Sequence, residues 1–175
     1  GIIAGLYEYY VSYVATYADK LKFIPFPIQL SEKKTIEIHD KVRFFIGIQK
    51  ERSAYKGTDI MYKALLRLAD DYPVLVEVVK VESAPFKQYV KLLGGSDVLL
   101  DQLYSYTPAM NALAAMAQGI AVVGGGEPEN YEILGDKDLF PIVNVLPNEA
   151  DVYEKLKALI QDKSSLIQRR KDSYT

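Results

Sequence analysis

The chain contains no cysteine, no tryptophan and a single histidine among its 175 residues. Without cysteine it can form no disulfide bond, no thiolate metal site and no cysteine nucleophile. His39 cannot form a histidine metal cluster on its own, and we interpret it as a structural or solvated residue. These absences exclude thiol chemistry and fit a cytoplasmic protein.

Long apolar runs and a strong net charge are also missing. No run approaches the ~20 apolar residues that a spanning helix needs, and no signal peptide opens the chain. The 21 Lys and Arg residues nearly balance 23 Asp and Glu residues. The overall charge therefore does not attract nucleic acid, and any anion site must be local. The length suits one domain with an appendage, and Gly1 in place of an initiator Met suggests a fragment or a processed chain.

The first 41 residues differ in pattern from the rest. Apolar residues at helical spacing predict a helix from Tyr7 to Ala18. Pro25 and Pro27 then force an edge strand or extended linker. We divide the chain into residues 1–28, a polar linker at 29–41, a main domain at 42–162, and a basic tail at 163–175 that is expected to form a last helix needing a partner surface.

From residue 42 onward, apolar strands alternate with amphipathic helices. Strands are expected at 42–48, 74–81, 98–103, 120–123 and 141–146, and helices at 58–69, 85–93, 108–118, from 128, and 150–161. Ser83 and Thr107 are the expected N-caps of the second and third helices, and the charged Glu77 and Lys80 indicate a strand nearer a sheet edge. This alternation predicts an α/β fold, a Rossmann-like three-layer sandwich with a mainly parallel sheet.

Three glycines follow one of these strands, at Gly124, Gly125 and Gly126. Ligands bind outside the carboxyl ends of parallel strands, where residues 104–107 and 124–127 would both lie. The dinucleotide spacing G-x-G-x-x-G is not met, because Glu129 stands where its last glycine should be. We expect nearby carboxylates, at Glu127, Glu129 and Glu132, to accept hydrogen bonds from sugar or ribose hydroxyls. The alternative is a solvated acidic helix start.

Two further loops are candidate diphosphate sites. The loop after the first strand carries Lys50, Arg52 and Lys56, and three cations there can neutralise a diphosphate. The loop at 105–107 offers the hydroxyls of Ser105, Tyr106 and Thr107 beside the free N–H groups of a helix start. A solvated charged loop and an ordinary N-cap are the respective alternatives.

An Asp-x-Asp sequence at Asp136, Lys137 and Asp138 follows Gly135. We interpret it as a solvated turn and not as a metal site. We expect that the protein needs no metal and no other cofactor, because the loop cations can neutralise a diphosphate and no ligand cluster is visible.

Three segments resemble the C-terminal, donor-binding domain of retaining glycosyltransferases with the GT-B fold. They are IGIQKERSAYKGTDIM, LLDQLYSYTPAMNALAAMAQG and VVGGGEPENYEIL, which follow the order of that family. The resemblance implies binding of a nucleotide sugar, and it makes residues 1–28 the end of an acceptor domain whose remainder is missing. It also implies a sugar or lipid-linked acceptor and surface or capsular polysaccharide synthesis at the inner face of a membrane. An isolated donor half is expected to bind nucleotide but not to turn over substrate.

Carried over by residue, the resemblance makes Arg52 and Lys56 ligands of the donor diphosphate. The paired glutamates of the family would fall at Tyr106 and Ala114, so both are absent here. Other residues are then candidates for the donor sugar and ribose: Gly125, Gly126, Glu127 and Glu132.

Two other classes share parts of this pattern. A sugar-nucleotide epimerase has a similar two-domain fold and would use similar phosphate contacts. A receiver domain also has a strand that ends in Asp, as Asp101 does here. A receiver domain needs an acidic pair after its first strand and a Lys after its fifth, but the first loop is basic and residues 145–147 contain no Lys.

Overall fold

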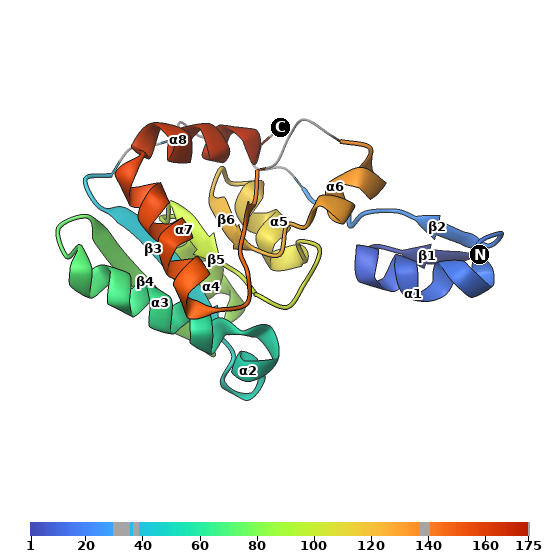
Figure 1. The fold of residues 1–175 in the computed structure, drawn as a ribbon, viewed down its shortest axis with the longest axis horizontal. Helices are drawn as coiled ribbons and strands as arrows, with labels where there is room; N and C mark the ends of the chain where they lie inside the picture. The colour runs from blue at the N-terminus through green and yellow to red at the C-terminus, as the bar shows by residue number, and fades with distance from the viewer. Residues whose placement is uncertain (30–35, 37–38, 137–140, 175) are drawn as a thin grey trace.

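The computed structural model describes residues 1–29, 36, 39–136 and 141–174. It consists of an α/β body and a small N-terminal unit at one side of that body (Figure 1). The body begins with β3 (Val42–Ile48), as the alternating pattern predicts.

The body contains a five-stranded sheet in the order β4-β3-β5-β6-β7, and every pair of neighbours is parallel. The other strands are β4 (Val76–Glu82), β5 (Val98–Leu100), β6 (Ala121–Gly124) and β7 (Val143–Asn144). The strands β5 and β6 carry no charged residue and β3 carries only Arg43, as expected for strands covered on both faces. The predicted parallel sheet is confirmed, and the charged β4 does lie at an edge.

Helices cover both faces of this sheet. The body helices are η1 (Lys50–Arg52), α2 (Ser53–Lys56), α3 (Thr58–Asp71), α4 (Phe86–Leu93), α5 (Met110–Met116), α6 (Pro128–Leu134), α7 (Glu149–Gln161) and α8 (Lys163–Asp172). Phe44 and Ile46 pack with α3, α7 and α8 on one face, whereas Phe45 packs with α4 and α5 on the other. The predicted three-layer sandwich is confirmed, because successive strand residues point to opposite faces.

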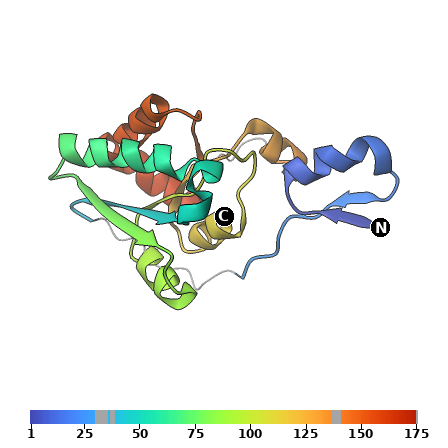
Figure 2. The ribbon, with the colours of Figure 1, turned by 90° about the horizontal axis from the view of Figure 1, so that it is seen from below.

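The N-terminal unit is a β-α-β element. It consists of β1 (Ile2–Ala4), α1 (Tyr7–Tyr17) and β2 (Leu21–Phe23), and its two strands are parallel neighbours. The sequence predicts α1 and the extended stretch after it, but it gave no sign of β1. α1 has no buried residue, and it lies beside α6 in both ribbon views (Figure 2).

Several predicted boundaries were wrong. Thr107 does not cap α5, which begins three residues later with Ala109 as N-cap, because the Thr107 hydroxyl is bonded to Glu8. Ser83 has a φ of 46°, and the N-cap of α4 is Pro85. Strands β5 and β7 are shorter than expected, since residues 101–109 and 145–148 leave the sheet as loops.

The tail helix α8 is docked on the body and is not left without a partner surface. Arg170 Nη1 donates to Asp97 Oδ1 at 2.6 Å, and Arg170 Nε donates to the carbonyl oxygen of Gly119 at 2.9 Å. His39 Nδ1 lies 2.9 Å from the same Asp97 oxygen, in line with a structural role. This buried cluster fixes the end of the chain to β5.

Candidate functional site

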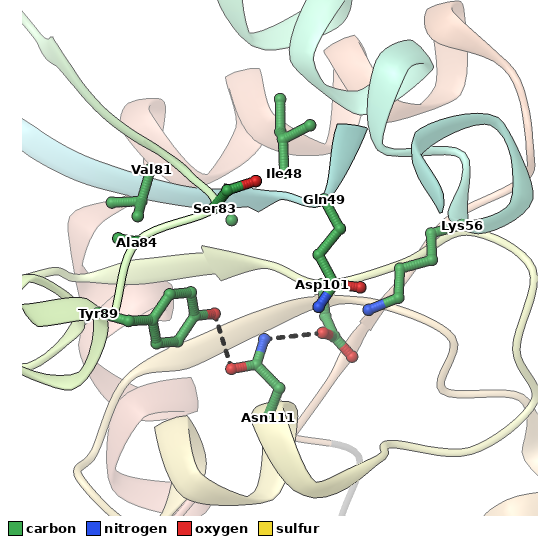
Figure 3. Close-up of a pocket in the computed structure, with 10 residues that line it drawn as sticks. Ile48, Gln49, Lys56, Val81, Ser83, Ala84, Tyr89, Asp101 and Asn111 are labelled. Carbon is green, nitrogen blue, oxygen red and sulfur yellow. Dashed lines mark hydrogen bonds between the residues drawn. The ribbon is translucent and has the colours of Figure 1, made fainter. Parts of the chain in front are cut away.

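A pocket of about 280 Å³ opens where β3, β4 and β5 end. Residues from strands β3 and β4, from helices α2, α4 and α5, and from the loops that follow β3, β4 and β5 line it (Figure 3). The lining residues are Gly47, Ile48, Gln49, Lys56, Val81, Ser83, Ala84, Tyr89, Asp101 and Asn111. The pocket therefore lies at the carboxyl edge of the sheet, where ligands of open parallel sheets bind.

One wall of the pocket is a chain of hydrogen bonds. The Tyr89 hydroxyl donates to Asn111 Oδ1 at 2.7 Å, and Asn111 Nδ2 donates to Asp101 Oδ1 at 3.0 Å. Burial raises the pKa of Tyr89 to about 12, so its hydroxyl stays protonated and keeps donating. The Asn111 amide is thereby fixed in one orientation, with its oxygen toward Tyr89 and its nitrogen toward Asp101.

The Lys56 side chain points toward the Asp101 carboxylate in the pocket (Figure 3). Burial raises the pKa of Asp101, although the hydrogen bond from Asn111 and the positive charge of Lys56 both lower it. A buried carboxylate with one oxygen bonded to Asn111 can accept a further hydrogen bond from a ligand hydroxyl. The ammonium group opposite it can neutralise an anionic ligand group.

Two glycines shape the pocket. A Cβ on Gly47 would lie 2.7 Å from the Tyr89 ring, so only glycine leaves room for that ring. Gly57 follows Lys56 and has a φ of 69°, a backbone conformation that favours glycine. A Cβ there would also lie 2.8 Å from Leu103 Cβ. Lys56 is held at this point because its carbonyl oxygen accepts from the Leu103 N–H at 2.8 Å.

The basic loop does not place all its cations in the pocket. Lys56 lines the pocket, whereas the Arg52 guanidinium lies 5.6 Å from the ring centre of the exposed Tyr55. Lys50 is exposed, and its Nζ lies 3.9 Å from Glu82 Oε2. The assignment of Arg52 to the donor diphosphate stays a prediction.

The donors of the loop at 105–107 bind a protein carboxylate. The N–H groups of Tyr106 and Thr107 donate to Glu8 Oε1 at 2.6 and 3.2 Å, and the Thr107 hydroxyl donates to Glu8 Oε2 at 2.5 Å. Ser105 Oγ also lies 2.8 Å from Glu8 Oε1. A diphosphate could use these donors only after Glu8 had left, and their predicted role remains a prediction.

The turn formed by Gly124, Gly125 and Gly126, here called the glycine turn, packs against the loop at 105–107. A Cβ on Gly125 would collide with the Ser105 carbonyl oxygen, and one on Gly126 would lie 2.8 Å from Ile142 Cγ2. Glu127 is the N-cap of α6, and its N–H donates to the Tyr106 carbonyl oxygen at 3.2 Å. All three glycines are buried. Protein packing alone is thus enough to require glycine at Gly125.

The acidic residues after the turn lie apart from the pocket wall. Glu127 is partly buried at the start of α6, and Glu132 is exposed on that helix. Neither residue lines the pocket. Their predicted contacts with the donor sugar remain predictions.

Of the residues that line the pocket, the sequence-based site contained Lys56 but not the hydrogen-bonded wall formed by Tyr89, Asp101 and Asn111. Asp101 drew notice only as an acidic strand end, and Tyr89 and Asn111 lie on helices without any local motif. A search for polar residues in the first turns of helices that follow strands would have found both.

Within the described residues, no group of three or more His, Asp or Glu side chains could hold a metal ion. Of Asp136, Lys137 and Asp138, the last two lie outside the described residues, as does much of the predicted linker. Among the described helices, none is long and apolar enough to cross a membrane.

The chain matches no family sequence model and no curated protein sequence, but it is similar to solved structures. Superposition on a mutant of S. aureus TarM in complex with fondaparinux, α-GlcNAc-glycerol and UDP gives a TM-score of 0.74 at 8% identity, and covers 99% of this chain and 39% of TarM. The C-terminal domain of the glycosyl transferase group 1 family protein LpcC from Francisella tularensis gives a TM-score of 0.55 at 18% identity. This match covers 76% of this chain and 82% of the LpcC chain.

A putative UDP-N-acetylglucosamine 2-epimerase from Listeria monocytogenes is also similar. Its TM-score is 0.56 at 12% identity, with coverage of 82% of this chain and 45% of the epimerase. The chain therefore has the fold of one Rossmann-like half of a GT-B protein. It spans about two fifths of the length of TarM.

Proposed function

We propose that the chain is the donor-binding half of a glycosyltransferase that uses a nucleotide sugar. The single observation that supports this most is the pocket at the carboxyl ends of β3, β4 and β5, where Lys56 faces Asp101 and Asn111. Nucleotides bind at the carboxyl ends of the strands in open parallel sheets of this kind. TarM, which has the same fold, was solved with UDP.

Each side of the pocket suits a different part of such a donor. Asp101 and Asn111 offer a hydrogen-bond acceptor and an amide to the nucleoside, and Lys56, with Arg52 from the same loop, neutralises the diphosphate. The sugar then extends toward the glycine turn, within reach of Gly126 and Glu127. This arrangement does not require a divalent metal, because Lys56 and Arg52 neutralise the charge of the diphosphate.

The N-terminal unit fits the end of an acceptor-binding domain. It is a separate β-α-β element, and its helix α1 has no buried residue of its own. In the complete enzyme, a sugar or lipid-linked acceptor would bind between the two domains. We place the enzyme in the cytoplasm, in surface polysaccharide synthesis at the inner face of the membrane, on the strength of the family resemblance.

Isothermal titration with UDP and UDP-N-acetylglucosamine tests this function. We expect both to bind in the presence of a chelator, and Lys56→Ala to weaken both by about 10- to 150-fold, as expected for a charge-assisted hydrogen bond of about 1.5 to 3 kcal/mol. Lys91→Ala, which removes an exposed cation on α4 outside the pocket, is the matched control. Equal affinities in the two variants would contradict the pocket assignment, and binding only with added magnesium would contradict the metal-free mechanism.

Epimerisation is the second candidate, because the Listeria epimerase has the same fold. Product analysis with the complete enzyme separates the two. A glycosyltransferase releases the nucleoside diphosphate only when an acceptor receives the sugar, whereas an epimerase changes the sugar without an acceptor.

A further inference from the structure

Glu8 belongs to α1, yet its carboxylate is bonded to a loop almost a hundred residues later in the chain. Two backbone N–H groups and one hydroxyl, from Tyr106 and Thr107, donate to its two oxygens at 2.5 to 3.2 Å. Thr107 is only 2% exposed, whereas Glu8 is partly buried and Tyr106 is exposed. Hydrogen bonds to a charged acceptor are among the stronger ones in proteins.

The protonation of Glu8 agrees with this geometry. Burial by itself would raise the pKa of Glu8, but hydrogen bonds from Thr107, Ser105 and Tyr106 outweigh burial and lower it below its usual value. Glu8 is therefore ionised at neutral pH and is held as a carboxylate. The Tyr7 and Tyr106 rings, with centroids 5.8 Å apart, add an apolar contact beside it.

The loop that Glu8 binds, residues 105–107, also packs against the glycine turn, residues 124–126. The Ser105 carbonyl oxygen packs directly against Gly125, and the Tyr106 carbonyl oxygen accepts from the Glu127 N–H at 3.2 Å. A shift of residues 105–107 would therefore move the turn as well. The N-terminal unit thus contacts the 105–107 loop, and this loop contacts the glycine turn.

We propose that Glu8 is a positioning residue, which fastens the N-terminal unit to the 105–107 loop and so holds the glycine turn in place for the donor sugar. The carboxylate beside the Tyr106 N–H thus comes from the N-terminal unit. Its link to the donor sugar rests on the proposed function, but the fastening itself does not.

The first test measures the fastening without any ligand. Because the chain has no cysteine, Ala15→Cys on α1 and Ala158→Cys on α7 introduce two dye sites for energy transfer. Glu8→Ala should lengthen and broaden the measured distance, and the amides of Tyr106 and Thr107 should exchange with deuterium at least about tenfold faster.

Two variants serve as controls for this measurement. Asp19→Ala removes an exposed carboxylate from the same unit and should change neither quantity. Thr107→Val removes one donor at nearly constant shape and should act in the same direction as Glu8→Ala, but add little in the double variant. It also keeps the proposal testable if Glu8→Ala does not fold.

A second test concerns the donor. Glu8→Ala should weaken UDP-N-acetylglucosamine by about tenfold and leave UDP nearly unchanged, since Glu8 does not line the pocket. Unchanged distance and exchange in both Glu8→Ala and Thr107→Val would overturn the proposal, as would equal loss of both ligands. If the unaltered chain bound neither ligand, the proposed function would fail, while the distance and exchange results would still decide the fastening.

Discussion

Asp97 should be one of the most sensitive positions for stability. The residue is 3% exposed, and its carboxylate accepts hydrogen bonds from Arg170 Nη1 at 2.6 Å and from the Arg43 N–H at 2.9 Å. His39 Nδ1 lies 2.9 Å from it. Through these contacts one carboxylate connects β5 with β3, with the residues before β3 and with α8.

Replacing Asp97 by alanine leaves the charge of Arg170 buried, because Arg170 is itself only 7% exposed. Breaking a buried ion pair by removing one partner costs about 3 to 5 kcal/mol. Since a domain of this kind has a total stability of about 5 to 15 kcal/mol, Asp97→Ala should lose at least about a fifth of it, and more than about half if the stability is at the low end of that range.

Urea denaturation followed by circular dichroism measures this loss. The control is Glu77→Ala, which breaks a more exposed ion pair with Arg43, at 3.1 Å between Glu77 Oε1 and Arg43 Nη2, and should cost at most about 1 kcal/mol. Pairing Asp97→Ala with Arg170→Met removes the buried charge and should recover part of the loss. A loss for Asp97→Ala no larger than that for Glu77→Ala would refute the reasoning.

Two further outcomes are expected. Glu127→Gln should weaken UDP-N-acetylglucosamine by about 1.5 to 3 kcal/mol and bare UDP much less, measured by calorimetry, because its charge would be lost only from the sugar contact; equal losses would mean that Glu127 serves only as the start of α6. The fastening by Glu8 should depend on pH as a lowered carboxyl pKa requires. It is complete above the usual value of 4.5 and is lost as pH falls through the lower value in the folded protein. The distance between the dyes at positions 15 and 158 should therefore lengthen only below pH 4.5. A lengthening between pH 7 and 5 would contradict this.

The fold could be predicted from the sequence because its signals are local. β3 is seven residues of nearly continuous apolar sequence, and α3 repeats its apolar residues at helical spacing. The charges on β4 also indicated its place at the sheet edge. β1 escaped, since three residues are too few for a period to be visible, and so did the short helices η1 and α2, whose residues were expected to form a loop.

The site was harder to predict because its contacts join distant parts of the chain. Tyr89 and Asn111 are 22 residues apart, and Glu8 lies 97 residues before Ser105. No spacing in a single sequence connects such pairs. Thr107 shows the consequence: its neighbours have the composition of a helix start, but a distant carboxylate takes its hydroxyl and α5 begins later.

Two glycines near the site have a structural role that the sequence did not reveal. The sequence assigned the glycine turn to the contact with a donor sugar, and the structure shows partners within the protein both for this turn and for Gly57, the glycine after Lys56. Gly57 faces Leu103, and Gly125 faces Ser105. Both partners lie on the loop between β5 and α5, which Glu8 also binds. This loop therefore sets the distance between the pocket cation and the glycine turn, so changes in it should alter donor binding even where they touch no ligand.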